Sequence, residues 1–349
     1  MQHKIRHLAL AAIATFMLIP PVEASPAEAT GIFLLIAPGA RQGGMGEAFV
    51  AVADDATATW WNPAGLAFMN QRELTLMHVN WLPAFHLPDL YYDFISYVNH
   101  VDEWGTYGLN VAFINLGESP WTDDVGTQLG TFRTYETAIT GSYGTTLSDN
   151  FGLGVNVKFI YSHLADQGAG QERGSGVATN FAVDLGTLYK MSDPILHRPL
   201  NFGGNLQNLG PKMAYIDQAQ ADPIPTNLKF GFAWEPINDG YNRLTLVGDM
   251  NKLLVRKFDD GKTDPFYVAV VTAWTDEPVF VDMIYNAGME YWYSDMIALR
   301  FGYWNDELGD LKPITYGASF KVSAYRFDFS YIKGSTQENT LRISLNINF

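Results

Sequence analysis

The chain has 349 residues, a net charge of −15 and no cysteine. An acidic chain without basic clusters excludes the phosphate-neutralising surface that nucleic-acid binding requires, and the missing cysteines exclude disulfides, thiolate metal sites and a cysteine nucleophile. Aromatic residues make up 14% of the chain and there are 32 glycines, a composition that suits an all-β membrane surface better than a helical enzyme.

The first residues are typical of an export signal. Lys4 and Arg6 give a positive start, and an unbroken apolar run follows from Leu8 to Ile19. Two small-residue cleavage sites come next, Val22-Glu23-Ala24 and Ala27-Glu28-Ala29. The alternative is a membrane-anchoring helix, which needs roughly 20 apolar residues, more than this run offers. We therefore predict export through a signal peptide over residues 1–29, cleaved at one of the two sites.

The stretch from Ala37 to Phe68 is rich in Gly and Ala and shows no clean helix or strand period. Pro63 pushes Asn62 out of the helical region, so Asn-Pro-Ala-Gly predicts a turn. Two adjacent tryptophans each bury on the order of 200 Å² when packed, so the stretch needs a large partner. We predict that residues 30–69 form a hatch or plug in the mouth of a β-barrel. The residues expected to build it are Gly43, Gly44, Met45, Gly46, Asp54, Asp55, Trp60, Trp61, Asn62, Pro63 and Ala64.

The acid pair Asp54-Asp55 has two interpretations. It could bind a cation together with backbone carbonyls, or it could cap a turn, the commoner role that we favour. The histidines are scattered without a ligand run, and no nucleophile elbow, P-loop or dinucleotide fingerprint is present. We therefore predict no catalytic group, no metal and no cofactor, and we do not expect an enzyme.

From Gln71 onward apolar and polar residues alternate, which predicts strands with an apolar outer face and a polar inner face. In the last segment one face carries Leu341, Ile343, Leu345, Ile347 and Phe349. About fourteen segments have this pattern, each near the length that crosses a bilayer when tilted. They span roughly residues 71–79, 90–100, 105–115, 131–147, 151–163, 174–190, 200–209, 226–236, 241–251, 283–293, 295–304, 313–322, 325–333 and 340–349.

The connections between these segments alternate between long and short along the chain. Long loops on one side and tight turns on the other are typical of outer-membrane barrels, whereas a soluble β-sandwich gives no reason for such sorting. We predict an all-β, antiparallel outer-membrane barrel of about 14 strands over residues 70–349. Its last strand must pair with the first to remove the sheet edge. The ending with Leu345, Ile347 and Phe349 resembles a barrel-assembly signal.

The predicted inward positions carry charges of both signs. Two interpretations remain: pairing across the lumen, which we favour, or a path for a solute. The charged positions are Glu136, Lys158, Asp184, Lys229, Asp249, Glu290, Arg300, Arg326, Asp328 and Arg342.

The run from Arg41 to Ala67 reads R-x-G-G-M-G-E-A-x-V-A-V-A-D-D-A-x-A-x-W-W-N-P-A-G-L-A. It resembles the N-terminal signature of the FadL-like outer-membrane family and, more narrowly, its PorV/PorQ branch, which belongs to the type IX secretion system. Later segments support that branch in order along the chain: GGNLQNLGPK at 203–212, PTNL at 225–228, NKLLV at 251–255, AGMEYWY at 287–293, FDFSY at 327–331 and NTLRISL at 339–345.

The resemblance implies two functions. In the first, the barrel receives exported cargo from the type IX translocon, recognises the cargo's C-terminal β-domain and hands it to a sortase attachment complex, surrounded by outer-membrane lipid and lipopolysaccharide. In the second, it is a FadL-like transporter of hydrophobic small molecules, with the plug as a moving hatch. We expect partner contacts at apolar residues in the long loops 80–89 and 252–282. These residues are Trp81, Phe85, Phe266, Tyr267, Trp274 and Phe280. The alternation over residues 267–272 could also offer a strand edge to the cargo.

Overall fold

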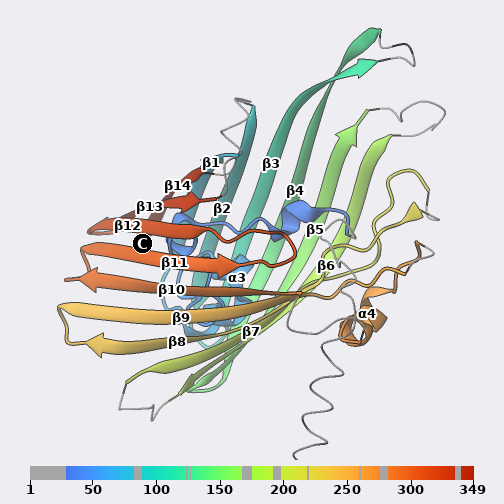
Figure 1. Ribbon diagram of the computed structural model, residues 1–349. Helices are drawn as coiled ribbons and strands as arrows, with labels where there is room; N and C mark the ends of the chain where they lie inside the picture. The colour runs from blue at the N-terminus through green and yellow to red at the C-terminus, as the bar shows by residue number, and fades with distance from the viewer. Residues whose placement is uncertain are drawn as a thin grey trace, which may run out of the picture.

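The computed structural model describes residues 29–81, 89–122, 125, 127–166, 175–191, 198–217, 220–258, 261–275, 282–334 and 339–349 (Figure 1). The proposed signal peptide, apart from residue 29, lies outside these ranges. Among the described residues, no helix is long and apolar enough to cross a membrane.

The described residues form fourteen strands that close into one antiparallel barrel, as the alternation predicted. Every strand pairs with its sequence neighbours, and β1 pairs with β14 to complete the ring. The strands are β1 (Glu73–Asn80), β2 (Leu90–Val101), β3 (Gly105–Thr122), β4 (Gln128–Ser148), β5 (Phe151–Ala165), β6 (Gly176–Met191), β7 (Leu200–Leu209), β8 (Asn227–Asn238), β9 (Asn242–Leu253), β10 (Met283–Tyr293), β11 (Ile297–Asn305), β12 (Ile314–Val322), β13 (Tyr325–Lys333) and β14 (Thr340–Asn348).

The outer face of the wall is apolar and the inner face is polar. On β14, Leu341 and Ile343 are exposed on the outside, whereas Arg342, Ser344 and Asn346 are buried inside. Because side chains alternate between the two faces of a strand, this pattern presents lipid with apolar groups and closes the backbone hydrogen bonds within the sheet. The outside of the barrel is therefore built for a membrane.

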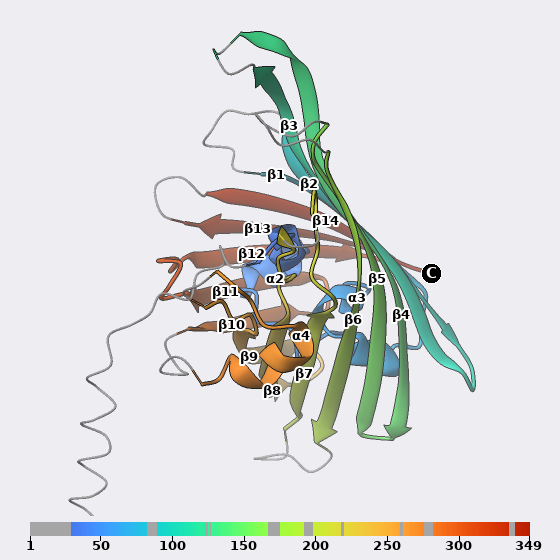
Figure 2. The ribbon, with the colours of Figure 1, turned by 90° about the vertical axis from the view of Figure 1, so that its right-hand side faces the viewer.

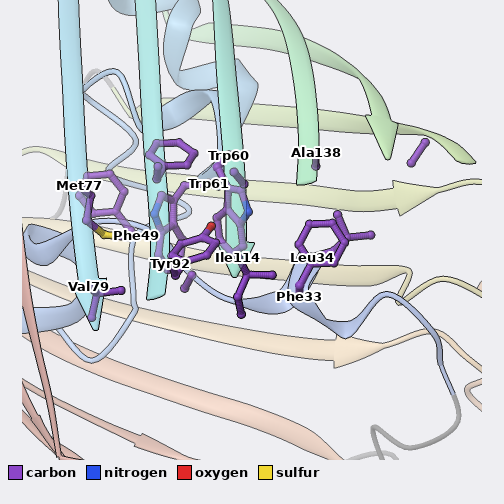
Figure 3. Packing of buried hydrophobic residues seen from close by; sticks show 14 of the residues in the cluster. Phe33, Leu34, Phe49, Trp60, Trp61, Met77, Val79, Tyr92, Ile114 and Ala138 are labelled. Carbon is purple, nitrogen blue, oxygen red and sulfur yellow. The ribbon is translucent and has the colours of Figure 1, made fainter. Parts of the chain in front are cut away.

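The core lies inside the barrel. It is built around residues 29–69, which we call the lumenal segment and which contains η2 (Ile32–Leu35), α2 (Ala40–Gly44), α3 (Ala58–Trp61) and η3 (Pro63–Phe68). Figure 2 shows α2 and α3 enclosed by the strands. Phe33, Phe49 and Trp61 of this segment share a buried cluster with Met77, Tyr92 and other inward side chains of the wall (Figure 3).

Aromatic rings mark one level of the outer wall, near the end with the long connections. His78, Tyr91, Phe113, Tyr135 and His163 form a chain across β1 to β5, with neighbouring ring centroids 5.0 to 6.0 Å apart. Such rings gather where a barrel meets the membrane–water interface. Because the long loops of outer-membrane barrels face outward, we assign this level to the extracellular side and refer to the loops above it as the extracellular rim.

Two expectations about the rim were wrong. The predicted loop 116–130 is largely strand, because β3 and β4 continue beyond their neighbours and project from the barrel (Figure 1). The predicted strand edge at 267–272 lies instead in the helix α4 (Phe266–Thr272). A short run of apolar residues does not separate strand from helix by period, and Pro265, fixed at φ −62°, stands directly before the first helical residue.

Candidate functional site

The turn at Asn62 is fixed by its own side chain. The Oδ1 atom of Asn62 accepts the amide of Ala64 at 3.1 Å, which caps η3, and Pro63 occupies the first helical position. The Nδ2 atom of Asn62 donates to the carbonyls of Val50 at 2.8 Å and Thr187 at 3.0 Å. One buried amide therefore joins two parts of the lumenal segment and the wall strand β6.

Trp60 and Trp61 anchor the segment in the lumen. Both are buried, and their rings meet edge to face with centroids 4.8 Å apart. Their backbone carbonyls accept side-chain amides from β7, Gln207 at 2.6 Å and Asn205 at 2.8 Å. The Lys229 ammonium lies over both rings, at 4.4 and 4.6 Å from the centroids. The pair therefore has apolar, hydrogen-bonding and cation–π contacts at once.

Wall glycines allow the backbone of the lumenal segment to touch the strands. A Cβ atom at Gly154 of β5 would lie 2.1 Å from the carbonyl carbon of Pro63, and one at Gly302 of β11 would lie 2.0 Å from the amide nitrogen of Gly46. Only glycine fits at such distances. Met45 and Gly44 lie against further wall glycines. The others in close contact with the segment are Gly108, Gly144, Gly152, Gly186, Gly203, Gly231, Gly288 and Gly317. No role was predicted for these glycines, although their recurrence inside alternating strands was a signal.

Arg41 joins the lumenal segment to the wall through buried ion pairs. Its Nε and Nη2 atoms each donate to Glu290 on β10 at 2.8 Å, and its Nη1 atom donates to Asp55 at 3.1 Å and to the half-exposed Asp54. Glu290 also accepts from Arg300 on β11 at 2.6 Å. Buried charges are tolerated when each has its partner, so this network depends on the segment being in place.

Asp55 both caps a turn and pairs with cations. Its Oδ1 atom accepts the amide of Thr57 at 3.1 Å, and its Oδ2 atom accepts from Arg41 and, at 2.9 Å, from Arg326 of β13. Burial alone raises the pKa of the Asp55 carboxyl, but Arg326 and Arg41 lower it by more, so its pKa lies below the ordinary value. The positive charges beside Asp54 and Asp55 are the guanidinium groups of Arg41 and Arg326. The described residues contain no group of three His, Asp or Glu side chains placed to hold a metal ion.

Further polar contacts hold the segment on β9 and β14, the strands next to β10 and β13. Asp249 of β9 accepts the amides of Phe49 at 2.7 Å and Val50 at 2.9 Å. Arg342 of β14 donates to the carbonyl of Ala37 and to Glu47, both at 2.8 Å. The inward charges therefore pair with one another and also bind the lumenal segment. The alternation pattern indicated the first kind of pairing but not the second.

A cavity of about 300 Å³ lies beside the lumenal segment, close to the extracellular rim. Its lining is mainly apolar with a few charges; it includes Leu35, Glu47, Lys229, Leu253, Ile284 and Trp304. The cavity has the mixed character typical of a small-molecule pocket.

The residues predicted for partner contact differ in how exposed they are in the structure. On α4, the side chains of Tyr267 and Val271 are 67% and 68% exposed. Phe266 lies edge to face with Tyr267, at 5.5 Å between centroids, and is partly buried. Trp274 is half-buried, and its indole donates to Val270 at 2.9 Å. Tyr267 and Val271 are therefore the side chains of α4 most open to a partner.

Among the remaining residues predicted for partner contact at the rim, the described side chain is less exposed. Trp81 is half-buried and packs on Tyr92, with ring centroids 6.4 Å apart. Phe85 and Phe280 lie outside the described residues. At the other end of the barrel, Leu345 and Ile347 lie on the outer face of β14, and the amide of Phe349 donates to the Arg72 carbonyl at 3.0 Å beside the β1–β14 seam.

Comparison with known proteins places the chain in a family. The family model described as "Type IX secretion system protein PorV" matches residues 24–260. The chain belongs to the PorV family. A search of curated proteins finds no match.

Solved structures with the same fold are FadL-like outer-membrane channels. The PorV-family chain is similar to the Pseudomonas putida toluene transporter TodX, with 15% identity, a TM-score of 0.53, and coverage of 89% of this chain and 96% of that one. A Pseudomonas aeruginosa FadL homologue has 13% identity, a TM-score of 0.52 and coverage of 88% and 97%. The Ralstonia pickettii toluene transporter TbuX has 12% identity, a TM-score of 0.50 and coverage of 89% and 97%. At these identities the likeness shows the fold, an outer-membrane barrel of the PorV and FadL type.

Proposed function

We propose that this PorV-family barrel binds the C-terminal β-domain of secreted cargo at its extracellular rim and carries it from the type IX translocon to the sortase attachment complex. The observation that carries the proposal is the apolar face of α4, where Tyr267 and Val271 are exposed above the membrane level. Exposed apolar groups of this kind mark interaction sites, and aromatic residues supply much of the energy at interfaces.

The filled lumen favours a role in binding and disfavours a role as an open channel. The lumenal segment contacts strands around the ring, from β3 to β14, through hydrogen bonds and backbone packing. A barrel filled in this way presents its rim as the working surface. The proposed activity is recognition and delivery, in which the barrel makes and breaks no covalent bond.

The test is capture of a purified cargo C-terminal domain by the folded barrel. Replacing both exposed α4 residues, Tyr267→Ser with Val271→Ser, should weaken capture at least tenfold, because a central aromatic contact contributes about 2 kcal/mol or more. Tyr241→Ser is the matched control, since Tyr241 is 71% exposed on the β8–β9 turn at the opposite end. Equal capture by the α4 double variant and the control would contradict the proposal.

A second candidate function is transport of a small apolar molecule, and the observation that favours it is the cavity of about 300 Å³ beside the lumenal segment. Filling that cavity with Ile284→Trp should abolish uptake of a probe such as toluene into liposomes if the barrel transports. Lost uptake with unchanged cargo capture would favour transport over cargo delivery.

A further inference from the structure

Strands β6 and β7 pair along only part of β6. Their last pair is Val183 with Leu209, where β7 ends, whereas β6 begins at Gly176. Residues 176–182 therefore have a strand partner in β5, but among the described residues they have no strand partner on the β7 side, where only Gly210 reaches Phe181. Just below, the register shifts between Val183 and Leu185, and Asn208 has a φ of +58°. Such a bulge bends a strand away from its partner, which explains where the pairing stops.

On the free side of β6, the backbone amide of Phe181 is satisfied by a side chain. The amide of Phe181 donates to the side chain of Asn180 at 2.9 Å, and Asn180 donates to the Pro211 carbonyl at 2.8 Å. Because alternate residues direct their backbone groups to the same side, Val177 and Thr179 point toward the missing strand as Phe181 does. Within the described ranges, no backbone hydrogen bond reaches Val177 or Thr179 from that side.

The connection from β7 to β8 covers the edge at Phe181, where a Cβ atom on Gly210 would lie 2.3 Å from the Phe181 carbonyl oxygen, and then turns into the lumen. Its residues Met213 and Ile224 are buried in the lumenal core. The Tyr215 hydroxyl lies 2.9 Å from the Ser162 hydroxyl on the inner face of β5, and the Thr30 amide donates to Pro223 at 2.9 Å. This loop therefore fills the space behind the wall, and no strand of the described part of the chain covers the side of β6 at Val177 and Thr179.

The free edge lies at the level of the aromatic rings. Thr179 pairs with Tyr161, and Val177 pairs with His163. Both rings contact Tyr135 in the chain of rings that marks the extracellular interface. An unpaired edge would be costly in the middle of a bilayer, whereas at this level it is open to a partner from outside.

The edge also lacks the usual protection against pairing. Natural edge strands carry lysine, proline or inward charges that prevent association, and residues 176–182 read GVATNFA, with no charge and no proline. Val177 and Thr179 are β-branched, and Phe181 is 62% exposed beside them. The loop that leaves β7 is tied to the chain before α4, since Lys212 donates to the Thr263 carbonyl at 2.6 Å. The free edge and the exposed α4 face therefore belong to one side of the rim.

We propose that the β6 edge at residues 177–179 pairs with an extended strand of the cargo's C-terminal β-domain, adding that strand to the barrel wall. This inference rests on the proposed cargo-binding function. An extended strand has alternating backbone donors and acceptors that can pair with those of the edge. The cargo's β-domain supplies a strand that is already in this conformation. The cargo would then be held both by backbone pairing at β6 and by side-chain contact at α4.

Disulfide mapping tests the pairing directly, because the chain has no cysteine of its own. Thr179→Cys should form a disulfide with cysteines at alternate positions of one cargo strand. Glu103→Cys, in the β2–β3 turn at the other end, is the control and should form none. Crosslinks scattered over all cargo strands, or a Thr179→Cys dimer of the barrel without a cargo adduct, would overturn the inference.

Proline substitution gives an independent test. Thr179→Pro removes the edge amide and should reduce cargo capture at least tenfold, whereas Thr179→Val keeps the amide and shape and should capture like wild type. If Thr179→Pro fails to fold, the disulfide pattern decides alone. Loss of capture in the α4 double variant with full capture by Thr179→Pro and no ordered disulfides would refute the edge and leave the proposed function standing. Absence of capture by the wild-type barrel would refute both.

Discussion

Arg41 and Glu290 form a two-point ion pair, with Nε to Oε2 and Nη2 to Oε1 both at 2.8 Å. The residues are 249 positions apart in sequence, one in the lumenal segment and the other on β10. The parallel geometry of the guanidinium and carboxylate fixes the segment in position as well as in charge. Substitution of this ion pair therefore tests how tightly the lumenal segment is held.

Arg41→Met should destabilise the docked lumenal segment by about 3–5 kcal/mol, because it leaves the buried carboxylates of Glu290 and Asp55 short of a partner. Limited proteolysis of the folded barrel should then cut within residues 29–69. Arg133→Met is the matched control, since Arg133 pairs with Glu118 on the exposed β3–β4 projection and its loss should leave the digestion pattern unchanged. Equal protease resistance of the Arg41 variant and wild type would contradict this prediction.

Gly154→Ala should displace η3 from the wall, because the added methyl would lie 2.1 Å from the Pro63 carbonyl carbon. Forced overpacking of this kind costs about 1–3 kcal/mol. Thermal unfolding in detergent should show a lower Tm. Gly141→Ala on the neighbouring strand β4 should leave Tm nearly unchanged, since nothing lies within 4 Å of its Cβ position; matching losses in both variants would show that strand glycine content, and not contact with η3, sets stability.

Asn62→Asp separates the two roles of the Asn62 side chain. The carboxylate can still accept the Ala64 amide, but it cannot donate to the carbonyls of Val50 and Thr187. We expect loosening of the segment by about 1–3 kcal/mol and faster entry of small sugars in liposome swelling. Permeability equal to wild type would mean that these donations do not seal the lumen.

Asp55→Asn should reveal a pH dependence of stability. The pKa of Asp55 is lowered in the folded protein, so the carboxylate stabilises the fold above its ordinary pKa of about 4 and loses that contribution as pH falls through the lowered value. The Tm difference between wild type and variant should be full above about pH 5 and should shrink in more acid solution. A constant difference across the pH range would exclude charge as the source of the Asp55 contribution.

Deleting Phe349 should reduce the amount of folded barrel in the outer membrane. Its amide donates to Arg72 beside the β1–β14 seam, and its side chain is 71% exposed to lipid or to an assembly factor. Gel mobility with and without heating measures the folded fraction. Phe349→Tyr keeps an aromatic end and serves as the control, and undiminished heat-modifiable protein in the deletion variant would refute the role.

The barrel was predictable because its physical requirement repeats fourteen times. Each strand must be apolar outside and polar inside, so alternation such as that of Leu341 and Arg342 is readable without any contact information. The contacts of the lumen were not readable in this way. Whether Glu290 pairs with Arg41 or with another cation depends on which part of the lumenal segment lies against β10 in the closed barrel, which no local pattern encodes.

The rim was the least predictable part for a different reason. The run around Tyr267 is apolar at nearly every position, so its composition fits a helix and a strand equally well. Only the packing of Trp274 and the helix start at Pro265 determine that it is a helix. The free side of β6 follows from where β7 stops, at the bulge beside Asn208. A bulge of one residue leaves almost no trace in the alternation.

The Ala40 amide donates to the Ser344 hydroxyl at 2.8 Å, across 304 positions of sequence. The lumenal segment is thus held in part by β14, and a barrel without β14 lacks this contact. Contacts of such long range form late and slowly in folding. The lumenal segment can therefore reach its final position only after β14 has been placed in the wall, so a filled lumen reports that this strand has joined the barrel.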